Sequence, residues 1–347
     1  MALAPAQVRR LLVMVARLEP KVQAAFIAAI GQAATAVDVA ALEAALRSGN
    51  IDAAMATLTL DDKALFPFTE ELRNSYLAGI SNAQRNLPFA VQANFGFGGN
   101  PRAVQAVRTL VTKITGEITA THVATTRALI STAVNEGVPV AQTALAIVGR
   151  KNAATGVREG GYLGLDNPRK EQAERVAAML RDPEKIKDYF NGKTARFTTT
   201  DRRFDARVRK AVAAGRGLTA AEAEPITTAH RARLLKNRGL TISRTETITA
   251  ARAGEMDGFR ALVDSGAISE SRIYRTWLST SDGRTRIDHV TMNGQEVQGM
   301  SAAFTFPDGT QAMFPGDPSL GASAGELIQC RCAQMINVRR PNGNQRA

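Results

Sequence analysis

Hydrophobic residues recur at every third or fourth position over most of the first 265 residues. Between residues 5 and 32, for example, Val8, Leu11, Val15 and Val22 fall on one face of a helix. The same spacing predicts further helices, with Gly, Pro, Ser and Asn at the breaks between them. Their approximate ranges are 37–47, 51–58, 61–87, 101–136, 140–148, 170–180, 183–190 and a basic helix from about 202.

A capping-box sequence marks the last helix of this series. Ser243 is followed three residues later by Glu246, and in such a box the two side chains satisfy backbone N–H groups in the first turn of a helix. We therefore expect a helix to begin at Ser243 and to run to Val263. The sequence Asp264-Ser265-Gly266 is expected to end it.

After Gly266 the pattern changes to that of strands and hairpins. Ile273–Leu278 is the clearest strand, and Asp-Gly or Asn-Gly pairs at 282–283, 293–294 and 308–309 are hairpin-turn signals. The expected fold class is therefore α+β, with a mainly α-helical N-terminal region and a small β-hairpin-rich C-terminal domain. Its expected elements are strands near 284–291, 296–298, 304–306 and 312–314, a short helix at 322–328 and a last strand at 331–338.

These patterns predict four regions along the chain. Residues 1–150 form a helical region, and residues 151–240 form a basic helical insertion or linker. The first part of that insertion, 151–170, is rich in glycine and is expected to be an exposed loop or hinge. Residues 241–338 form the small C-terminal domain, and 339–347 form a flexible tail.

Length and composition narrow the class of protein. A chain of 347 residues with 44% hydrophobic residues has room for about two domains with real cores. Its two cysteines are one residue apart and cannot build a disulfide scaffold, which favours a reducing cytoplasm. No signal peptide is expected, because charges interrupt the N-terminal segment and it has no apolar core that ends in a small-residue cleavage site. No membrane span is expected, because no apolar run of about 18 residues occurs.

The net charge of +12 is concentrated in one stretch. Between Arg196 and Arg244 twelve Lys and Arg residues accompany four Asp and Glu residues, an excess of eight positive charges. This favours non-specific contact with a polyanion such as the phosphates of double-stranded DNA, although a solvated helix surface beside an acidic partner gives the same pattern. The candidate residues near nucleic acid are Arg202, Arg203, Arg207, Arg209, Lys210, Arg231, Arg233, Lys236 and Arg238.

Three residues of the C-terminal domain are candidate metal ligands. Cys330 and Cys332 share a face if the chain is extended there, and a hairpin could bring His289 beside them. Thiolates and imidazole are good ligands for a structural zinc ion. Asp282, Asp288, Asp317 or water would complete the site. The alternative is two small buried cysteines and a hydrogen-bonded histidine.

Other residues of this domain are predicted to be structural. Arg284, Arg286 and Arg331 occur with Asp282, Asp288 and Asp317, and Arg–carboxylate pairs would hold the hairpins together. Trp277, the only tryptophan, is the predicted core anchor. His122 and His230 lie in helical segments without metal-type neighbours and are expected to be surface or hydrogen-bonded histidines.

Taken in order, these motifs resemble the C-terminal domain of the Mu F-like phage head morphogenesis (minor head) proteins. The resemblance covers about residues 243–338, and the helical pattern before it is similar to the family more weakly. It rests on an Arg-x-Glu-Thr segment (Arg244, Glu246), a Trp-to-His segment (Trp277, Thr280, Asp282, Arg284, Arg286, His289), Gly294, Phe304, Phe306, the Pro315–Pro318 turn with Asp317, and Cys330-Arg331-Cys332.

The resemblance implies a minor capsid protein of a tailed phage or prophage rather than an enzyme. Such a protein would bind the portal through its helical region, with the major capsid or a scaffold protein as further partners. Its basic stretch would lie near packaged DNA in the capsid interior of the virion, and the protein would be in the host cytoplasm during assembly. It would act in head assembly, DNA packaging or DNA delivery.

Two other classes of function remain open at this point. One is a DNA-binding packaging factor without portal contact. The other is an enzyme, either an ADP-ribosyltransferase built on Ser279-Thr280-Ser281 or a metal-dependent nuclease built on His289. The enzymes are disfavoured because Glu296 and Glu326 form no Glu-x-Glu or Gln-x-Glu pair, and no second histidine lies near His289 in the sequence.

Overall fold

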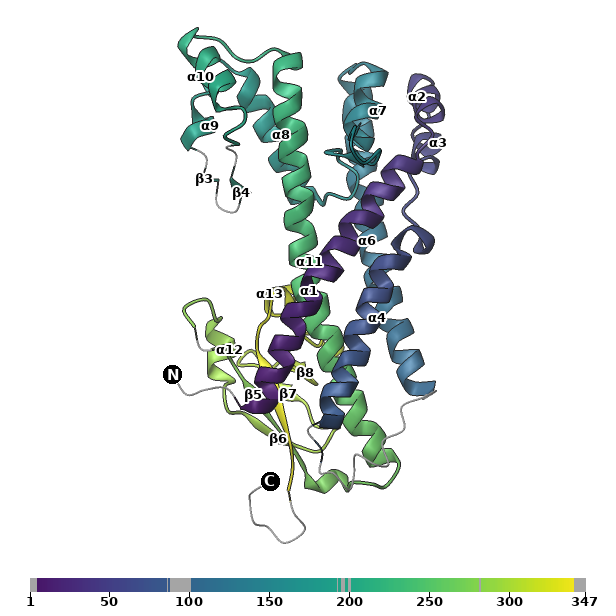
Figure 1. Cartoon of the computed structure of the whole chain (residues 1–347), viewed down its shortest axis with the longest axis vertical. Helices are drawn as coiled ribbons and strands as arrows, with labels where there is room; N and C mark the ends of the chain where they lie inside the picture. The colour runs from purple at the N-terminus through teal and green to yellow at the C-terminus, as the bar shows by residue number, and fades with distance from the viewer. Residues whose placement is uncertain are drawn as a thin grey trace. The chain divides into compact units, whose positions relative to one another are not determined.

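The computed structural model describes residues 5–85, 87, 101–191, 193–194, 197–198, 201–280 and 282–339 (Figure 1). Helices dominate up to Asp264, and short antiparallel strands follow, which confirms the α+β class. The helices are α1 (Ala6–Ala36), α2 (Val39–Arg47), α3 (Ile51–Ala56), α4 (Asp62–Arg85), α6 (Pro101–Asn135), α7 (Val140–Val148), α8 (Asn167–Arg181), α9 (Asp188–Asn191), α10 (Asp205–Ala213), α11 (Ala220–Asp264), α12 (Ile287–Thr291) and α13 (Ala324–Leu327).

The chain forms two compact units, each assembled from separate stretches. Unit 1 comprises Met1–Ala24, Phe68–Lys113 and Leu240–Ala347, and unit 2 comprises Ala25–Pro67 and Ile114–Gly239. Neither unit coincides with one of the four regions expected from the sequence, because α1, α4, α6 and α11 each contribute residues to both.

The helix expected to begin at Ser243 is instead the second half of a longer helix, α11 (Ala220–Asp264). The capping-box prediction was therefore wrong. The hydroxyl of Ser243 donates a hydrogen bond to Leu240 O at 3.2 Å, and the hydroxyl of Thr245 donates one to Thr241 O at 2.9 Å. Ser and Thr can satisfy their hydroxyls in this way inside a helix, so their presence does not require a helix start.

The strands of unit 1 form a three-stranded antiparallel sheet and a separate hairpin. The sheet has the order β6 (Glu296–Gln298), β5 (Ile273–Leu278), β9 (Ala333–Val338), so β5 is central. Alternate residues of β5 are buried, namely Ile273, Arg275 and Trp277. The hairpin joins β7 (Phe304–Thr305) to β8 (Gln311–Ala312), as the Asp308-Gly309 signal predicted.

The strand expected over 284–291 was wrong, because this segment contains the short helix α12. Val290 N–H donates to Arg286 O and Met292 N–H to Asp288 O, both at 3.0 Å, which are helical bonds. Hydrophobic positions in so short a segment fit both the helical spacing and the alternation of a strand, so the pattern alone could not decide between a helix and a strand. The helix buries His289 and leaves Ile287 and Val290 exposed.

The glycine-rich segment 151–170 is not an exposed loop or hinge throughout. In unit 2, β1 (Arg150–Lys151) pairs with β2 (Arg158–Glu159), and the following residues Gly160–Leu165 are buried. Buried arginines hold this segment, because Arg231 Nε donates to Gly160 O at 2.6 Å and Arg238 Nη1 to Gly164 O at 2.5 Å. The glycines therefore allow a tight approach of backbone rather than a hinge.

Among the described residues, no single helix has the length and apolarity of a membrane span. Helices α1 and α2, which are bent by 67° relative to each other, have that length and apolarity only when they are taken together.

Two glycines let α4 and α11 approach each other closely within unit 1. A Cβ added at Gly79 of α4 would lie 1.9 Å from Ala251 O, and one added at Gly254 of α11 would lie 2.0 Å from Tyr76 O. Both neighbours are helix backbone, which cannot move aside without shifting a whole helix. The contact between these helices therefore depends on the absence of two side chains.

We predict that Gly254→Ala lowers the free energy of unfolding by at least about 2 kcal/mol, because the added methyl group overpacks the crossing. The matched control is Gly116→Ala on α6, where an added Cβ would meet nothing within 4 Å. There the better helix propensity of alanine should raise stability by about 0.5–1 kcal/mol. Chemical denaturation of both variants tests this, and equal effects would refute the close packing.

Candidate metal centre

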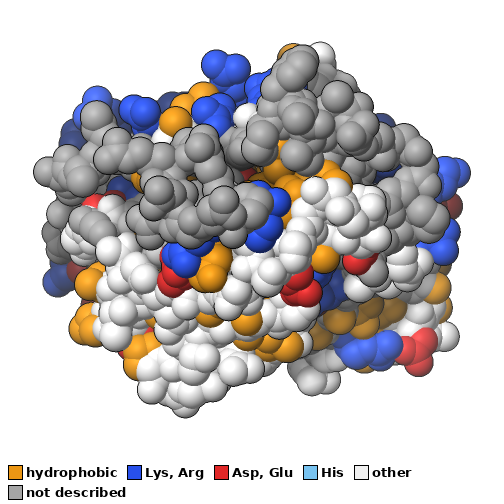
Figure 2. Space-filling model, turned by 90° about the horizontal axis from the view of Figure 1, so that it is seen from below, with side chains coloured by type: hydrophobic (Ala, Val, Ile, Leu, Met, Phe, Trp, Pro, Cys, Tyr) orange, Lys and Arg blue, Asp and Glu red, His pale blue; other side chains and the backbone are white. Residues whose placement is uncertain are grey.

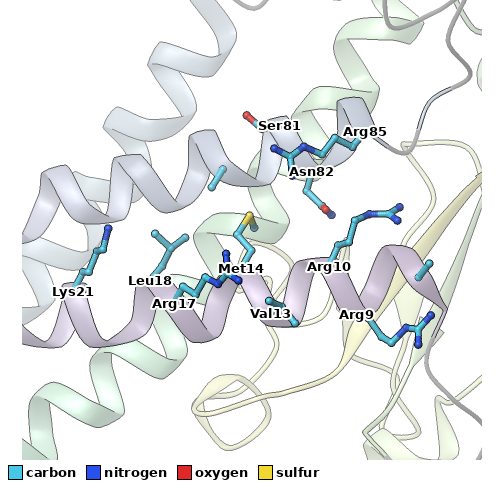
Figure 3. A pocket seen from close by; sticks show the side chains of 12 residues that line it. Arg9, Arg10, Val13, Met14, Arg17, Leu18, Lys21, Ser81, Asn82 and Arg85 are labelled. Atoms are coloured by element: carbon cyan, nitrogen blue, oxygen red, sulfur yellow. The ribbon is translucent and has the colours of Figure 1, made fainter.

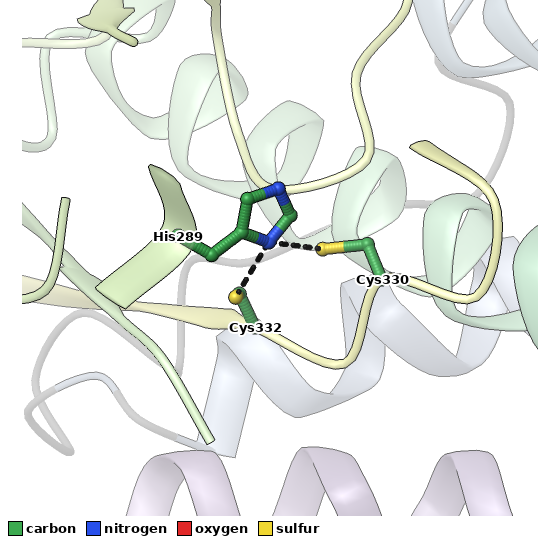
Figure 4. Close-up of side chains that lie close together, drawn as sticks. All are labelled: His289, Cys330 and Cys332. Atoms are coloured by element: carbon green, nitrogen blue, oxygen red, sulfur yellow. Dashed lines mark hydrogen bonds between the residues drawn. The ribbon is translucent and has the colours of Figure 1, made fainter. Parts of the chain in front are cut away.

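Three side chains of unit 1 bring metal-type ligand atoms together (Figure 4). His289 Nδ1 lies 3.2 Å from Cys332 Sγ and 3.7 Å from Cys330 Sγ. All three residues are buried, and their ligand atoms lie within 4.8 Å of one another. The structure thus brings together the three residues that the sequence analysis selected, in a group that could hold a metal ion.

Two separate segments position these atoms. Helix α12 directs His289 inward, and the chain between α13 and β9 carries both cysteines. Gln329, just before Cys330, has a φ of +57°, the only positive value at a described non-glycine residue. Its backbone N–H donates to Thr245 Oγ1 at 3.0 Å. This contact with α11 supports the turn that presents Cys330.

One face of α11 anchors the loops around the cysteines. Thr245 accepts from Gln329, Thr249 Oγ1 lies 3.5 Å from Gly316 O, and Arg252 donates to Pro315 O at 2.7 Å. Arg252 also approaches Cys330 O at 3.5 Å. Since these residues are three or four positions apart, they lie along one side of the helix.

The electrostatics of the group favour one thiolate at a time. A hydrogen bond with Cys332 lowers the pKa of Cys330 well below its usual value despite burial, and His289 and Arg252 lower it further. The same hydrogen bond, together with burial, raises the pKa of the Cys332 thiol. Of the two thiols, Cys330 is therefore the one that loses its proton first, and a bound cation would favour the loss of both protons.

His289 is polarised from its other nitrogen. Its Nε2 lies 2.6 Å from Glu326 Oε2, although the two atoms are not aligned as a hydrogen bond. Burial alone would lower the pKa of His289, but Cys330 and Glu326 outweigh it and leave the pKa raised. A carboxylate on the second nitrogen is the usual outer partner of a metal-bound histidine.

An unsatisfied donor also faces this group. The indole N–H of Trp277 is buried and lies close enough to Cys332 to lower the pKa of that thiol, although the two groups are not aligned as a full hydrogen bond. A thiolate at Cys332 would give it an acceptor. Two sulfurs and one imidazole nitrogen form a donor set suited to zinc, so the residues present fit such an ion.

The three aspartates considered as further ligands do not belong to this group among the described residues. Asp282 instead accepts from Arg331 at 2.8 Å, and this hydrogen bond is the main cause that lowers the pKa of Asp282. Asp317 accepts the backbone N–H groups of Met313 and Ser319 at 2.8 and 2.9 Å. The backbone N–H of Arg284 donates to Asp282 at 3.0 Å. These carboxylates hold turns and hairpins in place.

The other structural-motif residues are placed as follows. The Arg284 side chain is largely exposed and lies 3.5 Å from Asp282. Arg286 donates to Ile328 O at 2.6 Å, tying the α12 segment to the chain before the cysteines. Arg244 Nε lies 4.0 Å from Glu19 Oε2 in unit 1, and Glu246 is half-buried on α11. Of the expected Arg–carboxylate pairs, Asp282 therefore forms those with Arg331 and Arg284.

Trp277 is the core anchor that the sequence predicted. Its ring is fully buried and makes edge contacts with His289, Phe304 and Phe306, at centroid distances of 5.8, 5.3 and 5.6 Å. The indole therefore covers one side of the candidate ligand group. Such edge-to-face packing fixes the orientation of the imidazole.

The basic stretch is less uniform than its sequence indicated. Arg202, Arg203, Arg207, Arg209, Lys210 and Lys236 are exposed in unit 2, and Arg233 is half-buried. Arg203 pairs with Asp201 at 2.7 Å and Arg209 lies 3.9 Å from Asp205. Figure 2 looks from below the view of Figure 1 and labels none of these residues; on the face that it draws, Lys and Arg side chains occur at several separate places, with Asp and Glu among them.

Two residues assigned to a nucleic-acid surface are buried, so that assignment was wrong for them. Arg231 donates to Gly160 O and lies 3.2 Å from Glu224, and Arg238 donates to Gly164 O. Burial lowers the pKa of Arg238 to about 10, against the opposing charge of Asp166. Both guanidinium groups satisfy backbone carbonyls of unit 2, which sequence alone did not reveal.

The two remaining histidines lie inside unit 2 rather than at its surface. His122 Nε2 contacts Leu58 O at 2.7 Å, so it is hydrogen-bonded as expected. His230 has no hydrogen-bond partner at either ring nitrogen among the described residues, and burial lowers its pKa to about 4. Neither joins a described metal-type cluster.

Sequence reasoning missed several residues that support the site. Arg252, Glu326 and the threonines of α11 gave no motif signal, because their partners are distant in sequence. Arg275 was likewise missed. It is fully buried on β5, where it donates to Gly299 O at 2.8 Å and to the carbonyls of Met313 and Ala302.

Comparison of this chain with known protein families, with curated proteins and with solved structures found no match. The resemblance drawn from its motifs therefore stays a prediction.

We predict that the purified chain binds about one zinc ion and that cobalt in its place gives sulfur-to-metal charge-transfer absorption. Cys330→Ser, Cys332→Ser and His289→Ala should each abolish that absorption. Glu326→Gln keeps the three ligands but removes the outer carboxylate, so it should weaken metal affinity by roughly 10–100-fold.

The matched control for these variants is His230→Leu, which removes a buried histidine whose ring nitrogens bond to no described residue. It should leave metal affinity unchanged. Metal competition with a chromophoric chelator gives the affinities. Normal metal binding by the cysteine variants would show that the metal lies elsewhere in the chain.

A second buried group of unit 1 should make stability depend on pH. Glu255 is fully buried, accepts from Asn82 at 2.9 Å through Oε1, and has no partner for Oε2 among the described residues. Burial raises its pKa from 4.5 to about 7. The folded protein therefore retains a proton that the unfolded chain releases between these pH values.

We predict that the wild type loses stability relative to Glu255→Gln as pH rises from 4.5 through 7, by roughly 3 kcal/mol in total. The raised pKa means that the contribution of Glu255 is fully present below pH 4.5 and is lost as pH passes 7. Urea unfolding at pH 4.5 and 8, with the same metal saturation for both proteins, measures the difference. A pH-independent difference would contradict the protonated buried carboxyl.

Proposed function

We propose that this chain is a minor head protein of a tailed phage or prophage, whose C-terminal residues form a zinc-clamped structural module. The observation that carries the proposal is the convergence of the motif residues behind the resemblance. His289, Cys330 and Cys332 meet in one buried group, Trp277 packs against it, and Arg331 pairs with Asp282 beside it. Residues that occur far apart in the sequence thus serve one local structure.

Burial of this group favours a structural role over catalysis. Both cysteines are only 2% exposed, which leaves little access for a substrate. Three protein ligands would leave a fourth position for water, as in catalytic zinc sites, but burial would close that position to substrate. In the proposed module zinc would cross-link α12 to the chain before β9. The ion would supply a rigid connection where the strands are short.

The enzymatic alternatives find little support in the neighbouring residues. An ADP-ribosyltransferase needs a free glutamate, but Glu296 binds Arg339 at 2.8 Å and Glu326 lies beside His289. A histidine–metal nuclease needs carboxylates that face the metal, whereas Asp282 and Asp317 are committed to turns. The proposed protein is therefore not an enzyme.

The expected partners follow from the same proposal. A minor head protein would bind the portal protein, with the major capsid or scaffold protein as further neighbours, inside the virion. The exposed cations on and beside α10 would make non-specific contact with packaged double-stranded DNA. A packaging factor without portal contact would share this DNA binding but would be absent from finished heads.

Quantitative mass spectrometry of purified particles tests the proposal. The chain should be present at a low, fixed ratio to the major head protein in both empty precursors and DNA-filled heads. Particles assembled with Cys330→Ser/Cys332→Ser should contain less of it, because the module would fold poorly without its metal. Control particles would carry His230→Leu.

Each other outcome selects another function. Loss from filled heads alone would indicate a transient packaging factor. Absence from both kinds of particle would refute a head protein and return the nuclease and transferase hypotheses. Normal incorporation of the double cysteine variant would remove the metal from the proposal.

A further inference from the structure

A groove in unit 1 lies between the first part of α1 and the second part of α4 (Figure 3). Its volume is about 690 Å³. Along α1 the lining runs from Ala6 to Lys21, which at about 1.5 Å per residue is roughly 22 Å, or about four helical turns. The groove is thus long enough for one short helix.

The floor of the groove is partly apolar. Val13, Met14 and Leu18 of α1 and Ala78 of α4 line it, and Val13 is 54% exposed. An apolar residue this exposed gains free energy when a partner covers it. The floor therefore offers a hydrophobic stripe rather than a polar channel.

Cations surround this stripe. The groove-lining residues include five Lys and Arg side chains and, among the described residues, no Asp or Glu. Four of the five have no ion-pair partner in the described part of the chain, namely Arg9, Arg17, Lys21 and Arg85. In Figure 3 Arg10 and Arg85 lie on opposite walls at one end, and Lys21 lies at the other.

We propose that this groove binds an acidic amphipathic helix of a partner protein. Its apolar face would cover Val13, Met14 and Leu18, and its Glu or Asp residues would flank that face and meet the cations of both walls. An amphipathic helix presents residues at i, i+3, i+4 and i+7 in such a stripe. The proposal does not depend on the proposed function.

Charge complementarity favours an acidic helix of a partner over a segment of this chain as the occupant of the groove. The segments 1–4, 86–100 and 340–347 contain no Asp or Glu, so none of them can neutralise the five cations. Double-stranded DNA would satisfy the cations but would leave the apolar floor uncovered, because phosphate contacts need no hydrophobic surface. An acidic helix with an apolar face matches both features.

The test is fluorescence anisotropy with a designed 16-residue lactam-bridged helix that carries Leu along one face and Glu on both flanks. A second peptide has the same composition with the Leu residues spread around the helix, and a 20-base-pair duplex is the third probe. We expect the amphipathic peptide to bind at least tenfold more tightly than the scrambled one. Moderate salt should weaken it less than the duplex.

Variants assign the binding to the groove. Arg17→Glu/Lys21→Glu and, separately, Val13→Asp should each raise the Kd of the amphipathic peptide by roughly tenfold or more, about 1.4 kcal/mol. All three positions are exposed, so folding should survive, and circular dichroism checks it. Lys63→Glu, an exposed reversal on α4 outside the groove, should change Kd by less than twofold.

The competing outcomes are distinct. If the scrambled peptide binds as well as the amphipathic one, or if Val13→Asp has no effect, the groove responds to charge alone and the proposal fails. Binding of the duplex alone would make the groove a nucleic-acid site instead. Absence of peptide binding at millimolar concentration would also overturn the proposal.

Discussion

Two thiols and an imidazole share one buried space in unit 1, where any uncompensated charge is costly. Cys330 and Cys332 are held next to each other, and His289 approaches both. If both sulfurs were ionised without a cation, two negative charges would be buried together, which is costly. In the proposed module a divalent cation would balance that charge and would hold α12 against the chain before β9.

Buried arginines solve a related problem in the rest of unit 1. The loops that follow β6 and β8 carry carbonyl groups that no strand pairs, and such groups need donors when buried. Arg275 donates to three carbonyls from the centre of the sheet, and Arg252 donates to Pro315 O from α11. Short strands can therefore remain ordered, because each guanidinium group fastens several loops at once.

The sequence predicted what depends on local pattern. The helices up to Val148, the strand Ile273–Leu278 and the hairpin at Asp308-Gly309 follow from apolar spacing and turn residues. The ligand group was also predictable, since Cys-x-Cys and one histidine are chemically distinctive. Helix α12 and the continuous α11 were not, because a five-residue helix and a mid-helix Ser-x-x-Glu each have two local solutions.

Long-range contacts limited the rest. Nothing near Arg231 or Arg238 in the sequence indicates that each would meet the carbonyl of a distant glycine, so both were assigned to the surface. Glu326 and Arg252 gain their roles only when folding brings them to His289 and Cys330. Side-chain chemistry indicates what a residue can bind, whereas the fold decides which partner it meets.

Zinc K-edge X-ray absorption on the zinc-loaded full chain would test the metal centre most directly. Two sulfur neighbours at about 2.3 Å, with nitrogen or oxygen completing the shell and the pattern of histidine scattering, are the expected result. A shell of oxygen and nitrogen alone would contradict it. In that case the two cysteines would be ordinary buried thiols, and the packing around Trp277 would hold the module without a metal.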